Sequence, residues 1–310
     1  MNGRVVVLTG GVGGAKLALG LQQVIDPALI TAVVNTGDDF IHLGLRVSPD
    51  IDTLLYTLAG LANAAQGWGR EGESWAFMAA LRSLGGEDWF ALGDGDLALH
   101  VLRTMRLARG DTLSAITADF AKTWGIAMTV LPMSDNTIAT HLDTDEGMLS
   151  FQRYFVEQRC APVVRAITFA GATQAMPAPG VLEALLAEDT TAILIAPSNP
   201  FLSVDPILAV PGIRAALSAA RAPVVAVSPI VGGEAVKGPT AKLMRELGIA
   251  VSPQAVRAHY GDVLDGMLVD ERDGVTGLDL AHLSLDTLMI SLDDRVRVAQ
   301  AALALAGQLR

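Results

Sequence analysis

Six short apolar runs rich in β-branched residues constrain the fold of this 310-residue chain more than any other feature. Each run is continuous rather than alternating, which is typical of strands buried on both faces of a mostly parallel sheet. The runs span residues 4–9, 30–35, 126–132, 163–171, 191–197 and 223–229. Helical periodicity follows several of them, as at Leu17, Leu21, Val24 and Ile25 after the first. This alternation predicts an α/β protein with a doubly wound, mostly parallel, Rossmann-like sheet.

The chain has the length of one large α/β unit, so we expect residues 1–310 to form a single domain. From about residue 55 to 125 the pattern is more helical, which predicts a largely helical insertion that carries Trp68, Trp75 and Trp89. The segment 285–309 predicts a long C-terminal helix. We find no secretory signal pattern and no apolar run of about 18 residues, and therefore expect a soluble, cytoplasmic protein without membrane contact.

The charge balance limits the classes of partner. The chain has 22 Lys and Arg against 33 Asp and Glu, a net charge of −11, and its basic residues are scattered, which argues against nucleic-acid binding. An anionic substrate must then be held by backbone dipoles, a few cations or a metal ion. The single cysteine, Cys160, excludes an intrachain disulfide and a thiolate metal cluster and favours a reducing compartment.

Four glycines follow the first predicted strand, at positions 10, 11, 13 and 14, and Lys16 comes next. Glycine permits close backbone approach, and a helix start presents unpaired N–H groups, so a phosphate is the natural ligand. The stretch is not a P-loop, and Lys16 stands where a dinucleotide fingerprint needs its third glycine. The alternative is a tight strand-to-helix turn that binds nothing.

Acidic residues follow the second predicted strand, at Asp38, Asp39, Asp50 and Asp52. Ser48 and the proline after it have the pattern of a helix start, so the simplest interpretation of Asp50 and Asp52 is that they oppose the helix dipole. Carboxylates that converge near a phosphate are also how proteins hold Mg²⁺. Both interpretations remain open at this point.

Further polar or glycine-rich stretches occur at residues 92–100, 132–136, 196–200 and 228–239. The first contains Asp94, Asp96 and His100, and the last contains Lys237. Because most of these stretches follow predicted strands, their meeting at one sheet edge would suit a long ligand. The region 55–90 adds aromatic residues that could line a slot for a flat ligand: Tyr56, Trp68, Trp75, Phe77, Trp89 and Phe90. For each of them, burial in the hydrophobic core of the insertion is an equally good interpretation.

Five stretches in this order resemble the 2-phospho-L-lactate transferase (CofD-like) family: TGGVGGAKLALGL (9–21), NTGDDFIHLGLRVSPDIDT (35–53), LGDGDLALH (92–100), PSNP (197–200) and SPIVGGEAVKGP (228–239). The resemblance implies a step of coenzyme F-420 biosynthesis. A phospho-hydroxy-acid group passes from a guanosine diphospho donor to the ribityl hydroxyl of 7,8-didemethyl-8-hydroxy-5-deazariboflavin, and GMP is released. The resemblance also implies a requirement for Mg²⁺ and a homodimer.

On this resemblance, roles can be expected for individual residues. Asp50 would be catalytic, contacting the ribityl hydroxyl or the metal ion. The expected metal ligands are Asp50, Asp52 and Asp94. The expected deazaflavin contacts are Asp39, Asp50, Trp68, Trp89 and Asp94. The expected donor and phosphate contacts are Gly11, Val12, Gly13, Gly14, Lys16, Ser198, Asn199, Gly232, Gly233 and Lys237.

One position departs from the family pattern. Gly95 stands where members usually carry a basic residue, so the donor acid stays open among phospholactate, phosphoenolpyruvate and 3-phosphoglycerate. Arg46, Arg70 or Arg103 would have to supply the missing cation. A non-catalytic regulator that binds a nucleotide sugar, of the gluconeogenesis-factor type, is the alternative function. A nicotinamide-dependent dehydrogenase is disfavoured by the incomplete dinucleotide fingerprint.

Overall fold

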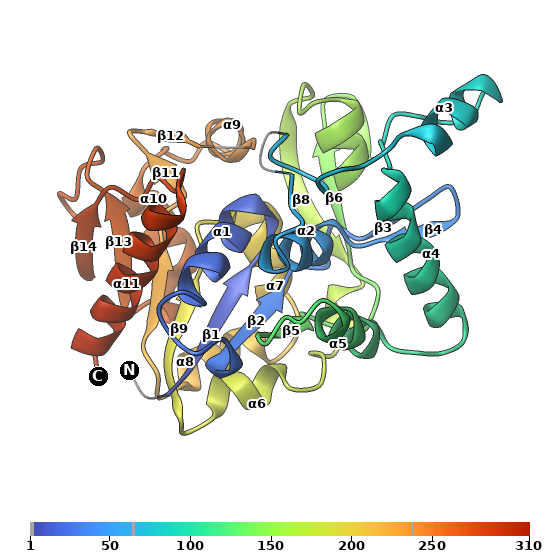
Figure 1. Cartoon of the computed structure of the whole chain (residues 1–310). Helices are drawn as coiled ribbons and strands as arrows, with labels where there is room; N and C mark the ends of the chain where they lie inside the picture. Colours follow the sequence, from blue (N-terminus) through green and yellow to red (C-terminus); the bar gives the residue numbers. More distant parts are fainter. Residues whose placement is uncertain (1–2, 64–65, 237) are drawn as a thin grey trace.

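The computed structural model describes residues 3–63, 66–236 and 238–310 (Figure 1). Among these residues a seven-stranded sheet has the order β14-β13-β10-β9-β1-β2-β5, and every neighbouring pair is parallel. Its strands are β1 (Arg4–Thr9), β2 (Ile30–Val34), β5 (Thr129–Pro132), β9 (Thr190–Ile195), β10 (Val224–Val227), β13 (Gly266–Asp270) and β14 (Ala281–Leu285). The predicted doubly wound α/β fold is confirmed.

Helices cover both faces of this sheet (Figure 1). In β1, Val5 and Val7 belong to one core cluster and Val6 and Leu8 to the other, because successive side chains of a strand point to opposite faces. The first cluster includes residues of α1 (Gly11–Leu21), α2 (Pro49–Leu58), α5 (Leu113–Thr123) and α11 (Leu292–Gln308). The second includes residues of α6 (Val181–Leu186), α7 (Asp205–Leu208), α8 (Ile213–Ala219), α9 (Thr240–Glu246) and α10 (Pro253–Tyr260). The strand runs are continuous and apolar because both faces are buried.

Residues 163–171 contain a strand, as predicted, but the prediction that this strand belongs to the parallel sheet was wrong. β8 (Val164–Ala170) pairs with β6 (Ala139–Thr144), which also pairs with β7 (Gly147–Ser150), in a separate antiparallel sheet. Most of β8 is exposed or only half-buried, because its run includes Arg165 and Thr168 and the parallel sheet does not enclose it. Two small hairpins complete the strands: β3 (Phe40–His42) with β4 (Leu45–Val47), and β11 (Ile230–Val231) with β12 (Glu234–Ala235).

Between residues 55 and 125 the regular elements of the described residues are helices: the end of α2, α3 (Ala76–Ser83), α4 (Asp94–Ala108) and α5. Short 3₁₀ or π turns lie elsewhere, at Pro27–Leu29, Arg153–Glu157, Ala172–Gln174, Pro200–Val204 and Gly261–Val263. In the described residues no single helix has the length and apolarity of a membrane span; the bent pair Pro200–Leu208 and Ile213–Ala219 meets those criteria only when taken together.

The C-terminal helix begins later than the sequence pattern predicts. The Ser291 hydroxyl accepts a hydrogen bond from the Asp294 N–H (3.1 Å), and the Asp294 carboxylate accepts one from the Ser291 N–H (2.8 Å). This reciprocal capping fixes the start of α11 at Leu292. Residues 286–290 therefore remain a loop between β14 and α11, and part of that loop lines the cavity described below.

The strand order reverses direction between β1 and β9. The chain first proceeds from β1 to β2 and β5, then returns to the other side of β1 and continues through β9, β10, β13 and β14. In open parallel sheets the loops beyond such a switch point diverge and leave a crevice for ligands. The glycine turn after β1 and the loop 196–199 after β9 meet there.

Candidate active site

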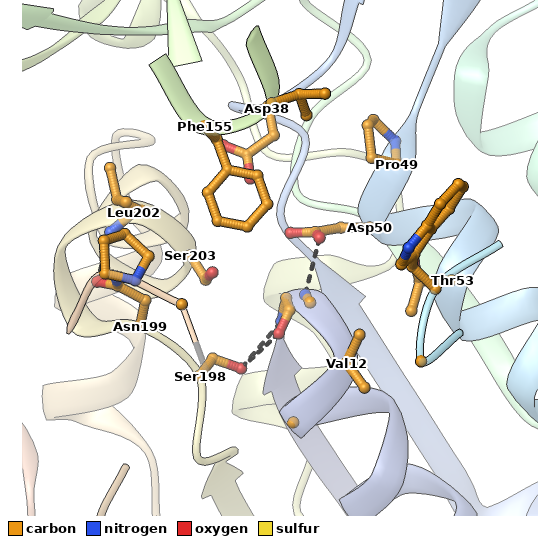
Figure 2. Close-up of a pocket in the computed structure, with 18 of the residues that line it drawn as sticks. Val12, Asp38, Pro49, Asp50, Thr53, Phe155, Ser198, Asn199, Leu202 and Ser203 are labelled. Atoms are coloured by element: carbon orange, nitrogen blue, oxygen red, sulfur yellow. Dashed lines mark hydrogen bonds between the residues drawn. The ribbon is translucent and has the colours of Figure 1, made fainter. Parts of the chain in front are cut away.

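A cavity of about 780 Å³ opens at this switch point. Its wall includes the glycine turn, the first turn of α2, the loop after β9, residues 228–240 in part, and the loop before α11. Figure 2 shows Asp50 and Ser198 on either side of the turn at the start of α1. Most of the strand-end motifs recognised in the sequence therefore lie around one cavity, but the stretch 132–136 does not line it.

The glycine turn is tight chiefly because of contacts within the protein. A Cβ at Gly13 would lie 2.6 Å from the Pro197 carbonyl oxygen, and one at Gly14 would lie 1.9 Å from the Thr9 hydroxyl. Gly11 differs, because its φ is +64° and its nearest neighbour would be Asp50 Oδ1 at 4.0 Å. A side chain at Gly11 would therefore enter open space, whereas a side chain at Gly13 or Gly14 would collide with the protein itself.

Asp50 lies at the start of α2, but its carboxylate is engaged by two other elements. Oδ1 accepts a 2.8 Å hydrogen bond from the Gly11 N–H, and Oδ2 accepts a 2.9 Å bond from Asn35 Nδ2 at the end of β2. Asp50 is 8% exposed and lines the cavity. Burial raises the pKa of Asp50 to about 6, although the bonds from Asn35 and Gly11 oppose that rise. The carboxylate is thus positioned at the cavity wall rather than merely opposing the dipole of its own helix.

Asp38 is a site residue to which the sequence analysis gave no individual role. It is 5% exposed, lines the cavity, and its Oδ1 has no hydrogen-bond partner among the described residues. Burial raises the pKa of Asp38 well above its ordinary value, and the nearby Asp50 charge adds to the effect. Asp39 accepts a 2.6 Å bond from the Ser48 hydroxyl and does not line the cavity. The adjacent acids Asp38 and Asp39 after the second strand are visible in the sequence, but the sequence does not show which of the two carboxylates faces the cavity.

Asp52 lines the cavity but is committed to Arg103. Both guanidinium NH groups of Arg103 bond to the two carboxylate oxygens, and both side chains are almost fully buried. Arg103 NH1 also lies 3.2 Å from His100 Nδ1, and His100 Nε2 lies 3.1 Å from Asp96 Oδ2. Asp52, Asp96 and His100 have the spacing of a metal site, but Arg103 already supplies the positive charge beside Asp52. This network is best described as a buried ion-pair cluster.

Asp94 lies outside the cavity wall. Its carboxylate accepts hydrogen bonds from the Ser74 hydroxyl (2.6 Å) and from the N–H groups of Ala76 and Phe77 at the start of α3 (both 3.1 Å). The bond from Ser74 is the largest cause that lowers the pKa of Asp94. Asp96 lines the cavity instead; burial raises its pKa, but bonds from His100 and Tyr56 outweigh this and lower the pKa overall.

The guanidinium of Arg70 occupies the space that a side chain at position 95 would need. A Cβ at Gly95 would lie 1.8 Å from Arg70 NH1, and the Gly95 N–H donates a 2.6 Å bond to Glu73 Oε2. A larger residue at position 95 is therefore incompatible with this arrangement of the segment 70–73. Of the three arginines considered in the sequence analysis, Arg70 is the one whose guanidinium lies at this position.

The aromatic candidates divide into two groups. Tyr56, Trp68, Trp89 and Phe90 line the cavity, whereas Trp75 and Phe77 do not. Two further aromatic residues in the wall, Phe151 and Phe155, come from outside the predicted insertion. They were missed because their strand-and-turn segment, 147–162, shows no signal that places it over the switch point.

The remaining predicted donor contacts differ in their placement. Ser198 and Asn199 both line the cavity. The Ser198 hydroxyl donates a 2.7 Å hydrogen bond to the Gly10 carbonyl and accepts a 3.2 Å hydrogen bond from the Gly10 N–H. Val12 lines the cavity as well, and so does Lys16, whose ammonium donates to the Met289 carbonyl (2.6 Å). By contrast, the N–H groups of Gly232 and Gly233 donate to Asp273, and neither residue lines the cavity. Lys237 lies outside the described residues.

Similarity to known proteins identifies the family of this chain. A family model described as 2-phospho-L-lactate transferase CofD matches residues 5–291. A protein named phosphoenolpyruvate transferase from Kitasatospora aureofaciens is 43% identical over 319 residues, covering 99% of both chains. Its namesake from Streptomyces coelicolor is 43% identical over 318 residues with the same coverage. A solved member of the UPF0052 family from Bacillus halodurans shares the fold, with a TM-score of 0.64 at 18% identity, covering 98% of this chain and 99% of that one. The chain described here therefore belongs to the 2-phospho-L-lactate transferase (CofD) family.

Proposed function

We propose that this protein transfers an enolpyruvyl phosphate group from a guanosine diphospho donor to the ribityl hydroxyl of 7,8-didemethyl-8-hydroxy-5-deazariboflavin. GMP is the second product, and the reaction belongs to coenzyme F-420 biosynthesis. The observation that carries the proposal is a cavity of about 780 Å³ whose wall joins the glycine turn, Asp50 and the aromatic side chains. A cavity of this kind suits a diphosphate and a flat ring system bound side by side.

The proposal for the donor rests on both the site and the relatives. Helix geometry leaves the N–H groups of Val12 and Gly13 without partners inside α1, and both residues line the cavity. These groups and the positive end of the helix dipole would bind the diphosphate. Among the three candidate acids, phosphoenolpyruvate is favoured because relatives 43% identical to this chain are named phosphoenolpyruvate transferases.

The aromatic part of the wall suits the acceptor. Trp68 is 50% exposed, and Trp89 stacks edge-on with His42 and lies under the Arg153 guanidinium at 4.4 Å. A flat tricyclic ring would cover such surfaces and remove them from water. The ribityl chain would then extend from the aromatic side chains toward Asp50.

The donor set at the wall fits Mg²⁺, which usually binds one or two carboxylates and phosphate oxygens. Asp38 lines the cavity and has a buried carboxylate oxygen without a partner among the described residues, and Asp50 lies close enough for its charge to raise the pKa of Asp38. We assign Asp38 and Asp50 as the ligands, in place of Asp52, which is paired with Arg103, and Asp94, which caps α3. When bound, the ion would offset the negative charge of the diphosphate.

In the proposed reaction the ribityl oxygen attacks the phosphorus that carries the enolpyruvyl ester. A new P–O bond forms as the bond from that phosphorus to the oxygen of GMP breaks, and the hydroxyl proton leaves the acceptor. Such transfers need mainly positioning and charge stabilisation. The glycine turn would hold the leaving phosphate, and Asp50 would orient the attacking hydroxyl and accept its proton late in the step.

Mass spectrometry of the products tests the proposal. Purified protein is incubated with Mg²⁺, the deazaflavin and, separately, the enolpyruvyl, lactyl and phosphoglyceryl forms of the guanosine diphospho donor. We expect the enolpyruvyl form to give the largest yield of phosphorylated deazaflavin with stoichiometric GMP. Faster turnover of another donor would overturn the assignment of the acid. Absence of product with all three, together with tight binding of a UDP-sugar, would support the regulator instead.

A further inference from the structure

The segment that covers the cavity opposite the glycine turn ends in an unusual backbone conformation. In the π turn Arg153–Glu157 and the residues after it, Arg159 has φ +48° and Cys160 has φ +58°. Among the described residues the one other non-glycine residue with positive φ is Leu43, in the β3–β4 hairpin. A residue with a side chain is strained in this conformation, whereas glycine adopts it freely. An arginine at position 159 therefore carries a cost that glycine would avoid.

This backbone is held firmly on both sides. The Gln158 N–H bonds to the Arg153 carbonyl and the Cys160 N–H to the Tyr154 carbonyl, each at 2.9 Å. Further along the chain, the Lys242 ammonium of α9 donates a 2.7 Å hydrogen bond to the Pro162 carbonyl. The position and direction of the chain at residue 159 are thus fixed before any ligand binds.

The Arg159 side chain has no evident structural task. It is exposed and lines the cavity, and among the described residues no hydrogen bond or ion pair engages its guanidinium. Of the described lining residues, Lys16 and Arg159 carry a lysine or arginine side chain, and Lys16 already donates to the Met289 carbonyl. In a chain with a net charge of −11, an arginine kept at a strained position in a cavity wall indicates an anionic ligand group.

The place of Arg159 indicates which anionic group this is. Figure 2 shows Phe155, four residues earlier on the same segment, beside Asp50 and across the open space from Val12 and Ser198. A diphosphate on the glycine turn would place the transferred acid between Asp50 and this segment. We propose that Arg159 binds the carboxylate of the three-carbon acid that is transferred. The inference rests on the proposed function and deepens it, because it names the group that the protein uses to recognise the acid.

The test compares two probes that differ in the carboxylate. One is enolpyruvyl-diphosphoguanosine, and the other is the β-methyl ester of GDP, which has the same diphosphate diester but no acid. Calorimetry with wild-type protein is expected to show tighter binding of the first by about ten- to a hundredfold, the range of a charge-assisted hydrogen bond. Arg159→Met is expected to abolish that preference while leaving affinity for the methyl ester within about twofold.

Matched variants show whether the preference depends on the charge at position 159. Arg165→Met removes another exposed arginine, which lies outside the cavity wall, and should leave the preference intact. Arg159→Lys should retain part of the preference, since a lysine keeps the charge but loses the bidentate geometry. Arg159→Gly should lose the preference for the carboxylate-bearing probe, yet its melting temperature should equal or exceed that of wild type, because glycine relieves the strain of the left-handed backbone. Leu43→Gly should have the same effect on the melting temperature for the same reason.

Three results would overturn the assignment of Arg159. If Arg159→Met weakens both probes equally, the residue binds phosphate and the carboxylate assignment is wrong. If the preference survives in Arg159→Met, or wild type shows none, Arg159 does not recognise the acid, and the proposed function stands. If wild type binds neither guanine nucleotide, the proposed function itself fails, and the inference fails with it.

Discussion

The Asp50 carboxylate accepts its 2.8 Å hydrogen bond from the backbone N–H of Gly11, so the first turns of α2 and α1 are joined at the switch point. Asn35 Nδ2 holds the other oxygen of Asp50 at 2.9 Å. The carboxylate therefore has a fixed direction at the cavity wall before substrate binds. This relationship separates Asp50 from the other acids of its motif.

Replacement of Asp50 by asparagine should slow turnover by at least about a hundredfold at saturating Mg²⁺. Removal of one charged group that stabilises a transition state costs about 3 to 4 kcal/mol. Affinity for GDP measured without Mg²⁺ should stay within about threefold, because the groups proposed to hold phosphate directly are backbone N–H groups. The measurements are GMP release by chromatography and GDP binding by calorimetry. Near-normal turnover would return Asp50 to a structural role and direct attention to Asp38 and Asp96.

The same variant should be more stable than wild type at alkaline pH. Because burial raises the folded pKa of Asp50 to about 6, above its ordinary value of 3.8, the folded state binds the proton more tightly. The contribution of Asp50 to the free energy of unfolding of the wild type therefore falls by about 3 kcal/mol as the pH rises from about 4 to above 6. Asp50→Asn escapes that cost but loses about 1 kcal/mol of hydrogen bonding. Urea unfolding without ligands should show a gain of about 1 to 2 kcal/mol at pH 8 that vanishes near pH 4; an equal gain at both pH values would contradict this.

Alanine at the two glycines of the turn should act on different properties. At Gly13 the new Cβ would meet the Pro197 carbonyl at 2.6 Å, so Gly13→Ala should lower stability by about 1 to 3 kcal/mol. At Gly11 the Cβ enters open space in the cavity, so Gly11→Ala should weaken GDP binding at least about tenfold for a stability cost of about 1 kcal/mol. Thermal melts and GDP titrations measure the two effects. Unchanged GDP affinity in Gly11→Ala would exclude a phosphate beside that residue.

The buried pair of Asp52 and Arg103 should show strong coupling. Arg103→Met leaves the Asp52 carboxylate buried beside no cation, which should cost about 3 to 5 kcal/mol of unfolding free energy. Adding Asp52→Asn to this variant should recover much of that loss. Chemical unfolding of the four proteins in the cycle measures the coupling free energy. Additive effects would show that the pair contributes no interaction.

Trp68 and Trp75 offer a matched pair for the acceptor site, because both are exposed tryptophans, at 50% and 36%, and of the two only Trp68 lines the cavity. Trp68→Ala should weaken deazaflavin binding by about tenfold. Trp75→Ala should change it by less than about twofold. Fluorescence titration of the deazaflavin measures both affinities. Equal effects from the two substitutions would place the ring elsewhere.

The sequence reveals much of the parallel sheet because stretches such as 5–8 and 192–195 are buried on both faces and are therefore uniformly apolar. It misses two strands. β13 (Gly266–Asp270) is fully buried, but it is short and its apolar run is bounded by glycine and aspartate, whereas β14 (Ala281–Leu285) lies at the sheet edge and includes His282 and Ser284. Motif spacing locates Asp50 and Ser198, since both follow strand ends. It does not distinguish Asp96 from Asp94, because the direction of each side chain depends on the contact of α4 with the segment 70–77. Phe155 and Arg159 belong to a segment whose position over the cavity is set by tertiary packing.

The bonds that close the glycine turn also set the order in which the site can be completed. Gly10 is bound to Ser198, 188 positions later, and Lys16 to the carbonyl of Met289, 273 positions later. A nascent chain released to residue 200 would have the glycine turn and Asp50 but not the loop that holds Lys16. The complete nucleotide site should therefore form only after residue 289 has left the ribosome, although its first element is made within the first 20 residues.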